Sequence, residues 1–392
     1  STTRSAPEPL RRGAASRVLH TVAGNRPRRL DWTLVGGVLA LTAIGTLLLA
    51  AATYEPGHPE SPLAYVERHL AHVGIALAVG AAVAFVDYRK PRAYAPIVFV
   101  ASSVLLALVL SPLGQVVNGS RSWVALGPLQ LQPSEFAKVG LVLMAAMLLG
   151  EPRDGETAPT SRDVLFSLGA TAVPLGLVML QPDLGTGMVV GVTYLAMLTL
   201  SGAPLRWIAG MLACGVAVVV AVWWFGLLKA YQLARFTSFL DPSVDARGTG
   251  YNANQAMISV GSGGISGTGL FQGEQTAGRF VPEQHTDFIF TVAGEELGFV
   301  GGITVIGLLV LVLMRILRIA AGCEQPYARL VCVGVAAWFA FQGFINIGMT
   351  IGVTPITGIP LPFVSYGGSA TIANMAAVGL VLGVHARDRG FE

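Results

Sequence analysis

Charged residues are scarce in this chain of 392 residues, since Asp, Glu, Lys and Arg together make up only 12% of it. A soluble globular domain carries about 25% charged residues, so the composition excludes an ordinary soluble protein. Hydrophobic residues make up 53% of the chain, as is typical of proteins that cross a lipid bilayer. The composition therefore predicts an integral membrane protein.

Cysteine is also rare, and its three positions, Cys214, Cys323 and Cys332, form neither a CxxC pair nor a metal-binding spacing. All three fall in or near apolar stretches, which predicts buried free thiols. Residues 1–30 are rich in Arg, Pro, Ser and Ala and contain no signal peptide, which predicts a disordered basic tail on the cytoplasmic side. The chain has no nucleic-acid signature, and its glycine-rich segment 261–269 lacks the ending of a phosphate-binding P-loop.

Long apolar runs dominate the rest of the chain. A run of about 17–25 apolar residues is long enough to cross the bilayer as a helix. The sequence predicts an all-α fold with a membrane domain over 31–385, a cytoplasmic tail at 386–392 and ten spans, which lie at about 31–54, 69–86, 93–111, 133–150, 164–181, 184–201, 206–227, 288–314, 329–352 and 367–385.

The distribution of positive charge predicts the orientation of these spans. With a cytoplasmic N-terminus, 18 of the 25 Lys and Arg residues lie on the cytoplasmic side. Because cytoplasmic loops are enriched in Lys and Arg, this pattern favours ten spans with both termini inside. The seven remaining basic residues are Arg68, Arg121, Lys138, Lys229, Arg235, Arg247 and Arg279.

Two segments on the extracytoplasmic side are unusual, namely 118–138 and the far longer 228–287. A connection of some sixty residues greatly exceeds the usual length, which indicates a function. Its first part, 231–242, has apolar residues at helical spacing around Arg235 and predicts a short helix in the membrane interface. The glycine-rich stretch 248–273 is apolar enough to dip back toward the membrane as irregular backbone.

Asp287 ends this long loop, directly before the eighth span. One interpretation is structural: Thr286 caps the following helix and Asp287 lies in its first turn, where the helix dipole favours a carboxylate. The other is functional, because a carboxylate at the edge of the membrane can act as a general base on a substrate hydroxyl. His285 is either a partner of Asp287 or simply a polar loop residue.

Other polar residues in or beside the spans also have two interpretations. Glu135 and Lys138 are three residues apart and form either a local ion pair or, with Arg121, a site for an anionic group. Glu295 and Glu296 are predicted to be buried polar contacts between helices, and Glu295 lies too far along a straight helix to pair with Asp287. Asp183 is predicted to cap a helix, and Ser365 lies in a proline- and glycine-rich elbow at 354–369.

Six segments in this order resemble the SEDS family (shape, elongation, division and sporulation) of bacterial RodA and FtsW proteins. They are NGSRSWVALGPLQLQPSEFAK, QPDLGTG, YQLARFTSFLDP, GSGGISGTGLFQGEQT, FVPEQHTDFIFTVAGEELGFVGG and FINIGMTIGVTPITGIPLPFVSYGGS. The resemblance covers about residues 30–385. The segments TGIPLPFVSYGG and EQHTDFIF look more like RodA, of the elongation machinery, than like FtsW, of division.

The resemblance implies a ten-span, GT-C-like peptidoglycan glycosyltransferase of the bacterial cytoplasmic membrane. Such an enzyme polymerises lipid II at the outer face and works with a class B penicillin-binding protein. The essential aspartate of the family corresponds to Asp287, and Lys138, Glu135 and Arg235 correspond to other positions of its active cavity. The family has a basic residue directly before the loop tryptophan, Trp123, but here that residue is Ser122 and Arg121 lies one position earlier.

The chemistry of this reaction suggests roles for the remaining charges. Asp287 would take the proton of the acceptor hydroxyl, while Lys138, Arg235 and Arg279 are candidates to stabilise the departing pyrophosphate. A divalent cation, Mg²⁺ or Mn²⁺, could assist, although no paired-carboxylate cage is apparent and no metal ligand is assigned. The alternatives are a lipid II flippase, a division polymerase of the FtsW type, or a non-catalytic scaffold that recruits the transpeptidase.

Overall fold

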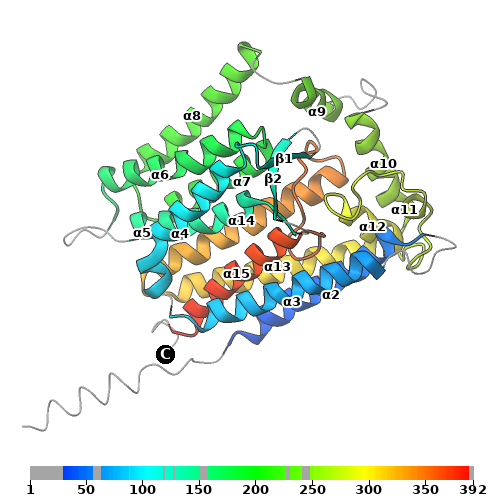
Figure 1. Cartoon of the computed structure of the whole chain (residues 1–392), viewed down its shortest axis with the longest axis horizontal. Helices are drawn as coiled ribbons and strands as arrows, with labels where there is room; N and C mark the ends of the chain where they lie inside the picture. Colours follow the sequence, from blue (N-terminus) through cyan, green and yellow to red (C-terminus); the bar gives the residue numbers. More distant parts are fainter. Residues whose placement is uncertain are drawn as a thin grey trace, which may run out of the picture.

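The computed structural model describes residues 30–55, 63–87, 89–117, 120–126, 129–150, 158–226, 230–240 and 248–387. It is a bundle of long helices, from which α9, α10 and α11 project at one end (Figure 1). The predicted tail at 1–30 lies almost wholly outside the described residues, as does most of the tail at 386–392.

Each of the ten predicted spans falls on a helix of the bundle. These helices are α2 (Trp32–Thr53), α3 (Leu63–Phe85), α4 (Arg89–Leu108), α5 (Pro133–Leu149), α6 (Ser161–Leu180), α7 (Leu184–Leu200), α8 (Leu205–Trp224), α13 (Gly298–Gly322), α14 (Pro326–Thr350) and α15 (Gly368–His385).

Length and hydropathy support an integral membrane protein. Among the described residues, eight helices are long and apolar enough to cross a bilayer, and α5 and α7 are slightly shorter, with 17 residues each. Many large apolar side chains on these helices are exposed, which is expected where lipid rather than water surrounds the protein. The structure therefore supports a membrane domain of many spans.

Close packing of backbones holds the bundle together around α14 and α15, the two most buried of the eight long apolar helices. A Cβ atom added at Gly379 of α15 would lie only 2.3 Å from the carbonyl oxygen of Gly80 on α3, and one at Gly45 of α2 would lie 2.4 Å from that of Val364. Small residues allow such approaches between membrane helices. The elbow before α15 is thereby packed directly against α2.

The prediction of an all-α fold is wrong in one region, because segment 114–131 forms a small antiparallel sheet. Its strands are β1 (Gly114–Val117), β2 (Ser120–Leu126) and β3 (Leu129–Leu131), in the order β1-β2-β3. β3 leads directly into α5, whose Pro133 occupies the first turn, where a missing N–H group costs nothing. The sheet therefore fixes the entry to the helix that carries Glu135 and Lys138.

The eighth predicted span is not one straight helix. It begins with α12 (Ile289–Glu296), breaks at Leu297 and continues as α13. Gly298 has φ +66°, and an added Cβ there would lie 2.3 Å from the backbone nitrogen of Gly267. Only glycine accommodates both the left-handed conformation and this close approach. The break turns the last carbonyl groups of α12 toward the long connection.

The long connection 228–287 is largely folded where it is described. The short helix predicted at 231–242 is present as α9 (Ala230–Leu240), while its position in the membrane interface stays a prediction. The glycine-rich stretch 248–273, by contrast, is not irregular throughout, because it contains α10 (Thr249–Ser262). The short helix α11 (Glu274–Ala277) follows directly after it. Residues 241–247 lie outside the described part of the chain.

One of the three cysteines departs from the prediction of buried thiols. Cys323 and Cys332 are buried, whereas Cys214 is exposed on α8. None of the residues of α8 is buried, and this helix lies apart from the rest of the bundle (Figure 1). The structure thus gives α8 an apolar surface with few protein contacts.

Candidate functional site

Asp287 lies in a tight turn directly before α12. The carbonyl oxygen of Glu283 accepts hydrogen bonds from the backbone N–H groups of Thr286, Asp287 and Phe288, at 3.1, 3.1 and 3.3 Å. The structural interpretation, in which Thr286 caps the helix, is wrong, because α12 begins at Ile289 without a side-chain cap and the Thr286 hydroxyl donates to the Glu283 carbonyl instead. Asp287 therefore precedes the helix and does not belong to its first turn.

An amide of α14 holds the backbone at Asp287. The Nδ2 group of Asn346 donates to the carbonyl oxygens of Asp287 and Ile359, both at 2.7 Å. Asn346 is completely buried. One side chain therefore ties the turn before α12 to the elbow 354–369, although these segments are far apart in the sequence.

Arg235 of α9 approaches the same elbow from the other side. Its Nη1 group donates to the carbonyl oxygen of Thr357 at 3.3 Å. The next residue, Gly358, has φ +75°, and a Cβ atom added there would lie 3.3 Å from Oδ2 of Asp287. The elbow thus brings a guanidinium group and a carboxylate to two adjacent residues.

The surroundings of Asp287 favour a proton acceptor at neutral pH. Burial of its carboxyl group and the neighbouring Glu283 carboxylate raise the pKa of Asp287 to about 7, whereas the positive charge of Arg235 lowers this pKa. Asp183, at the start of α7, raises it as well. A base whose pKa lies near the working pH combines a useful deprotonated fraction with sufficient basicity.

We expect Glu283→Gln to shift the pH dependence of any reaction that needs Asp287 as a base. The substitution removes a negative charge that raises the pKa of Asp287, so this pKa falls and the rate is retained at lower pH. A profile of kcat/KM against pH measures the shift, and the wild-type rate should increase with pH up to about 7. An unchanged acidic limb would contradict this role of Asp287.

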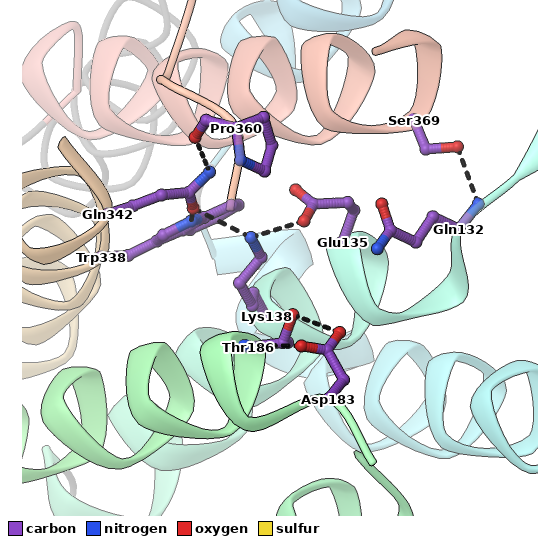
Figure 2. A network of polar contacts seen from close by, with 9 residues as sticks. All are labelled: Gln132, Glu135, Lys138, Asp183, Thr186, Trp338, Gln342, Pro360 and Ser369. Atoms are coloured by element: carbon purple, nitrogen blue, oxygen red, sulfur yellow. Dashed lines mark hydrogen bonds and ion pairs between the residues drawn. The ribbon is translucent and has the colours of Figure 1, made fainter. Parts of the chain in front are cut away.

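A second cluster of polar side chains surrounds Lys138 within the bundle (Figure 2). Lys138 is buried, and its Nζ group donates to Glu135 Oε1 at 2.7 Å and to Gln342 Oε1 at 3.0 Å. The same ammonium group lies 4.6 Å from the ring centroid of Trp338. The predicted ion pair of Glu135 and Lys138 is therefore present, and it continues into α14.

Gln342 connects this buried charge with the elbow. Its Oε1 atom accepts from Trp338 Nε1 at 2.6 Å, and its Nε2 group donates to the carbonyl oxygen of Pro360 at 2.7 Å. Asn346, one turn further along α14, bonds to Ile359. Two amides on one face of α14 thus hold consecutive residues of the elbow, and one of them also contacts Lys138.

Asp183 caps a neighbouring helix, as predicted. Its carboxylate accepts from the backbone nitrogen of Thr186 at 3.0 Å and from the Thr186 hydroxyl at 2.7 Å. The same side chain influences the pKa of Asp287. The start of α7 therefore lies close enough to the turn at Asp287 to act on it electrostatically.

Glu295 and Glu296, at the end of α12, bind backbone groups of the long connection 228–287. The carboxylate of Glu295 accepts from the backbone nitrogens of Gln275 and Thr276, at 2.7 and 2.9 Å, and from the Thr276 hydroxyl at 2.7 Å. Glu296 Oε2 accepts from the backbone nitrogen of Phe271 at 3.0 Å. These contacts hold α11 and the residues before it over the end of α12.

Four other predicted residues lie outside these polar groups. Arg121 and Trp123 belong to β2, where they pair with Val116 and Gln115 of β1. Arg279 forms an exposed salt bridge with Glu55 at 2.6 Å. Ser365 is buried, and its hydroxyl accepts from the backbone nitrogen of Leu361 within the elbow.

His285 contributes to a cluster of aromatic rings beside the turn. Its ring centroid lies 5.6 Å from that of Tyr65 and 5.9 Å from that of Tyr366. His69 and His72 of α3 also approach Tyr366, at 5.9 and 6.3 Å. Both histidines of α3, which the sequence does not assign to a function, thus lie near the loop that carries Asp287.

Gln342 and Asn346 are the two connecting residues that the sequence analysis missed. A signal for them existed, because two amides four residues apart in an apolar span lie on one face of a helix. Polar residues at membrane depth usually face the protein interior, where they find partners. Their partners, the carbonyl groups of the elbow, could not be inferred from the spacing alone.

Together these features define an integral membrane protein in which a carboxylate, a guanidinium group and a buried ion-pair network meet at the elbow 354–369. Residues 31–390 match the family model of the FtsW, RodA and SpoVE cell cycle proteins. The chain belongs to this family.

Individual relatives agree with this assignment. The chain is 36% identical to the peptidoglycan glycosyltransferase MrdB of Escherichia coli K12 over 356 residues, which cover 91% of this chain and 93% of MrdB. It is also 36% identical to the stage V sporulation protein E of Bacillus subtilis over 362 residues, 92% of this chain and 98% of that protein. A probable peptidoglycan glycosyltransferase FtsW of Coxiella burnetii has the same identity over 361 residues, 90% of this chain and 95% of that FtsW.

Two solved structures share the fold. One is a chain from a study of how a peptidoglycan synthase complex coordinates polymerization and crosslinking, with a TM-score of 0.75 and 35% identity, covering 91% of this chain and 97% of that one. The other is the rod shape determining protein RodA of Thermus thermophilus, with a TM-score of 0.67 and 32% identity, covering 92% of this chain and 98% of that one.

Proposed function

We propose that this protein is a peptidoglycan glycosyltransferase that polymerises lipid II into glycan strands, with Asp287 as the general base. The observation that carries the proposal is the geometry at the elbow, where Arg235 binds Thr357 and the Asp287 carboxylate lies against Gly358. Arg235 and Asp287 thus contact two adjacent residues of the elbow. A base and a cation this close together suit a reaction that takes a proton from an attacking hydroxyl and releases a pyrophosphate leaving group.

In this reaction Asp287 takes the proton of the acceptor hydroxyl. The hydroxyl oxygen forms a bond with the anomeric carbon of the donor, and the bond from that carbon to the pyrophosphate oxygen breaks. The leaving group departs with the bonding electron pair as polyprenyl pyrophosphate, and the anomeric centre is inverted. Fixed positive charge near the pyrophosphate stabilises this departure, and Arg235 is the cation beside Asp287.

The sequence suggests three cations that could stabilise the departing pyrophosphate, and their surroundings differ. Arg235 is favoured among the three, because its positive charge acts directly on Asp287. Lys138 binds Glu135 and Gln342, and exposed Arg279 pairs with Glu55. Assistance by a divalent cation, Mg²⁺ or Mn²⁺, stays an open proposal. The described residues contain no group of three or more His, Cys, Asp or Glu side chains that could hold a metal ion.

The proposal includes a location and a partner. It places ten spans in the bacterial cytoplasmic membrane, both termini in the cytoplasm, and Asp287 with the connection 228–287 at the outer face, in a GT-C-like arrangement. A class B penicillin-binding protein would crosslink the product, which is consistent with a relative from a peptidoglycan synthase complex. A role in elongation is proposed from the RodA-like segments, while identities to MrdB and FtsW are equal at 36%.

Incubation of the purified protein with lipid II alone, followed by analysis of product length, tests this function. We expect glycan polymer, because the base, the cation and their supporting network all belong to this one chain. Transport of lipid II across vesicle membranes without polymer would instead indicate a flippase. Absence of polymer both with and without the transpeptidase, while the transpeptidase still binds, would indicate a scaffold.

A further inference from the structure

A small slot lies beside Arg235 and has no role in the reaction described above. It lies between α9, α10, the end of α14 and the first residues of the elbow, and its volume is about 60 Å³. A cavity of this size holds roughly four waters. The slot is therefore large enough for a short length of a single hydrocarbon chain.

The walls of this slot are mostly apolar. Phe239 of α9, Ala253 and Met257 of α10, Met349 of α14 and Ile356 of the elbow all line it. Methionine side chains are flexible and polarisable, so they adapt to ligands of irregular shape. Walls of this composition suit a branched hydrocarbon better than a sugar or a peptide backbone, whose polar groups would lose their hydrogen bonds.

One wall of the slot carries a positive charge. Arg235 lines it and also donates to the carbonyl oxygen of Thr357, the residue next to Gly358. Since the Asp287 carboxylate lies against Gly358, the charged wall of the slot is adjacent to the proposed base. A ligand that fills the slot would thus place an attached anionic group between Arg235 and Asp287.

Part of the slot's wall is also exposed at the surface of the protein. Met257 of its wall is 36% exposed, and Phe239 of α9 is 37% exposed. Leu233, on the same helix, is 42% exposed, as expected for a helix that lies in the membrane interface. A lipid in the outer leaflet could therefore enter beneath α9 without crossing the helical bundle.

We propose that this slot binds the first isoprene units of the lipid-linked donor and that Arg235 contacts the donor's pyrophosphate. The inference rests on the proposed function and extends it, because it assigns the donor to the α9 and α10 side of Asp287. A polyprenyl pyrophosphate joins a single branched chain directly to two phosphates, and this combination matches an apolar slot with a guanidinium wall. A diacyl phospholipid carries two chains on the glycerol that is joined to its phosphate, and it fits a single narrow slot poorly.

Binding of undecaprenyl pyrophosphate to the purified full-length protein tests the slot without requiring catalysis. Ala253→Phe places a ring in the slot, and we expect it to weaken binding by about tenfold, a loss that corresponds to roughly two buried methylene groups. Ile258→Phe, on an exposed position of α10 outside the slot, should bind as the wild type does. Met257→Trp fills the slot from its exposed wall. This variant serves as the test instead of Ala253→Phe if Ala253→Phe unfolds at a lower temperature than the wild type.

Two further probes separate the lipid from its head group. Inorganic pyrophosphate should bind Ala253→Phe and the wild type equally, whereas Arg235→Gln should weaken the binding of both pyrophosphate and undecaprenyl pyrophosphate. The proposal would be overturned if a folded slot-filling variant bound undecaprenyl pyrophosphate as tightly as the wild type does. It would also be overturned if phosphatidylglycerol competed with undecaprenyl pyrophosphate as well as unlabelled undecaprenyl pyrophosphate does. Slot-dependent binding without polymer from lipid II would contradict the proposed function and leave the slot assignment intact.

Discussion

Asp287→Asn should abolish glycan polymerisation while leaving the protein folded. The amide has the shape of the carboxylate but cannot accept the proton of the acceptor hydroxyl, and loss of a general base costs about 10²–10⁴-fold in rate. Folding should be retained because the contacts that hold this turn are made by backbone groups: Asn346 donates to the Asp287 carbonyl, and Glu283 accepts from the Asp287 nitrogen. Polymer from purified variant and lipid II measures the effect.

The matched control is Glu283→Gln, which changes a carboxylate in the same turn to an amide. Glu283 is exposed and raises the pKa of Asp287 without being the proposed base, so this variant should still polymerise lipid II. Thermal unfolding of both variants shows whether the fold is intact. Polymerisation at the wild-type rate by a folded Asp287→Asn protein would rule out Asp287 as the base.

Lys138→Met should destabilise the protein strongly. It leaves the Glu135 carboxylate buried without its cation and removes a donor to Gln342, in a region where both charged side chains are almost inaccessible. Breaking a buried pair by removal of one partner costs about 3–5 kcal/mol. The free energy of unfolding in detergent, or the unfolding temperature, measures this loss.

The double variant Glu135→Gln with Lys138→Met separates a structural role of Lys138 from an anion-binding role. With both charges removed, no uncompensated charge stays buried, so the stability should recover in large part. Recovered stability with recovered polymerisation would indicate that the role of Lys138 is structural, whereas recovered stability without polymerisation would indicate an anion-binding role. Wild-type stability of the single variant would contradict the structural argument.

The positions of the spans could be predicted from the sequence because each one depends on a local property. An apolar run of sufficient length must form a helix in lipid, since every backbone group has to be satisfied within the segment. Each predicted span therefore falls on a helix, and the short helix α9 was also anticipated from its spacing. The break at Leu297 was not, because the left-handed Gly298 that follows it packs against the backbone of Gly267 in the long connection. The small sheet between 114 and 131 was missed although its strands pair only with one another.

The candidate site shows the same division. Glu135 and Lys138 are three residues apart, so their ion pair follows from the geometry of one helix. The capping role of Asp183 is equally local, since its partner is Thr186. The proposed cap at Thr286, by contrast, was wrong, because the turn after Glu283 ends before α12 starts.

By itself, the sequence determined a membrane protein with apolar helices, a polar connection and an aspartate at the end of that connection. Only the tertiary structure decided which groups surround Asp287, because its surroundings come from segments far apart in the chain. Arg235 and Thr357 are separated by 122 positions, and Lys138 and Gln342 by 204. Neither pair can be inferred from local spacing, since each contact exists only when the packing of the helices brings these segments together.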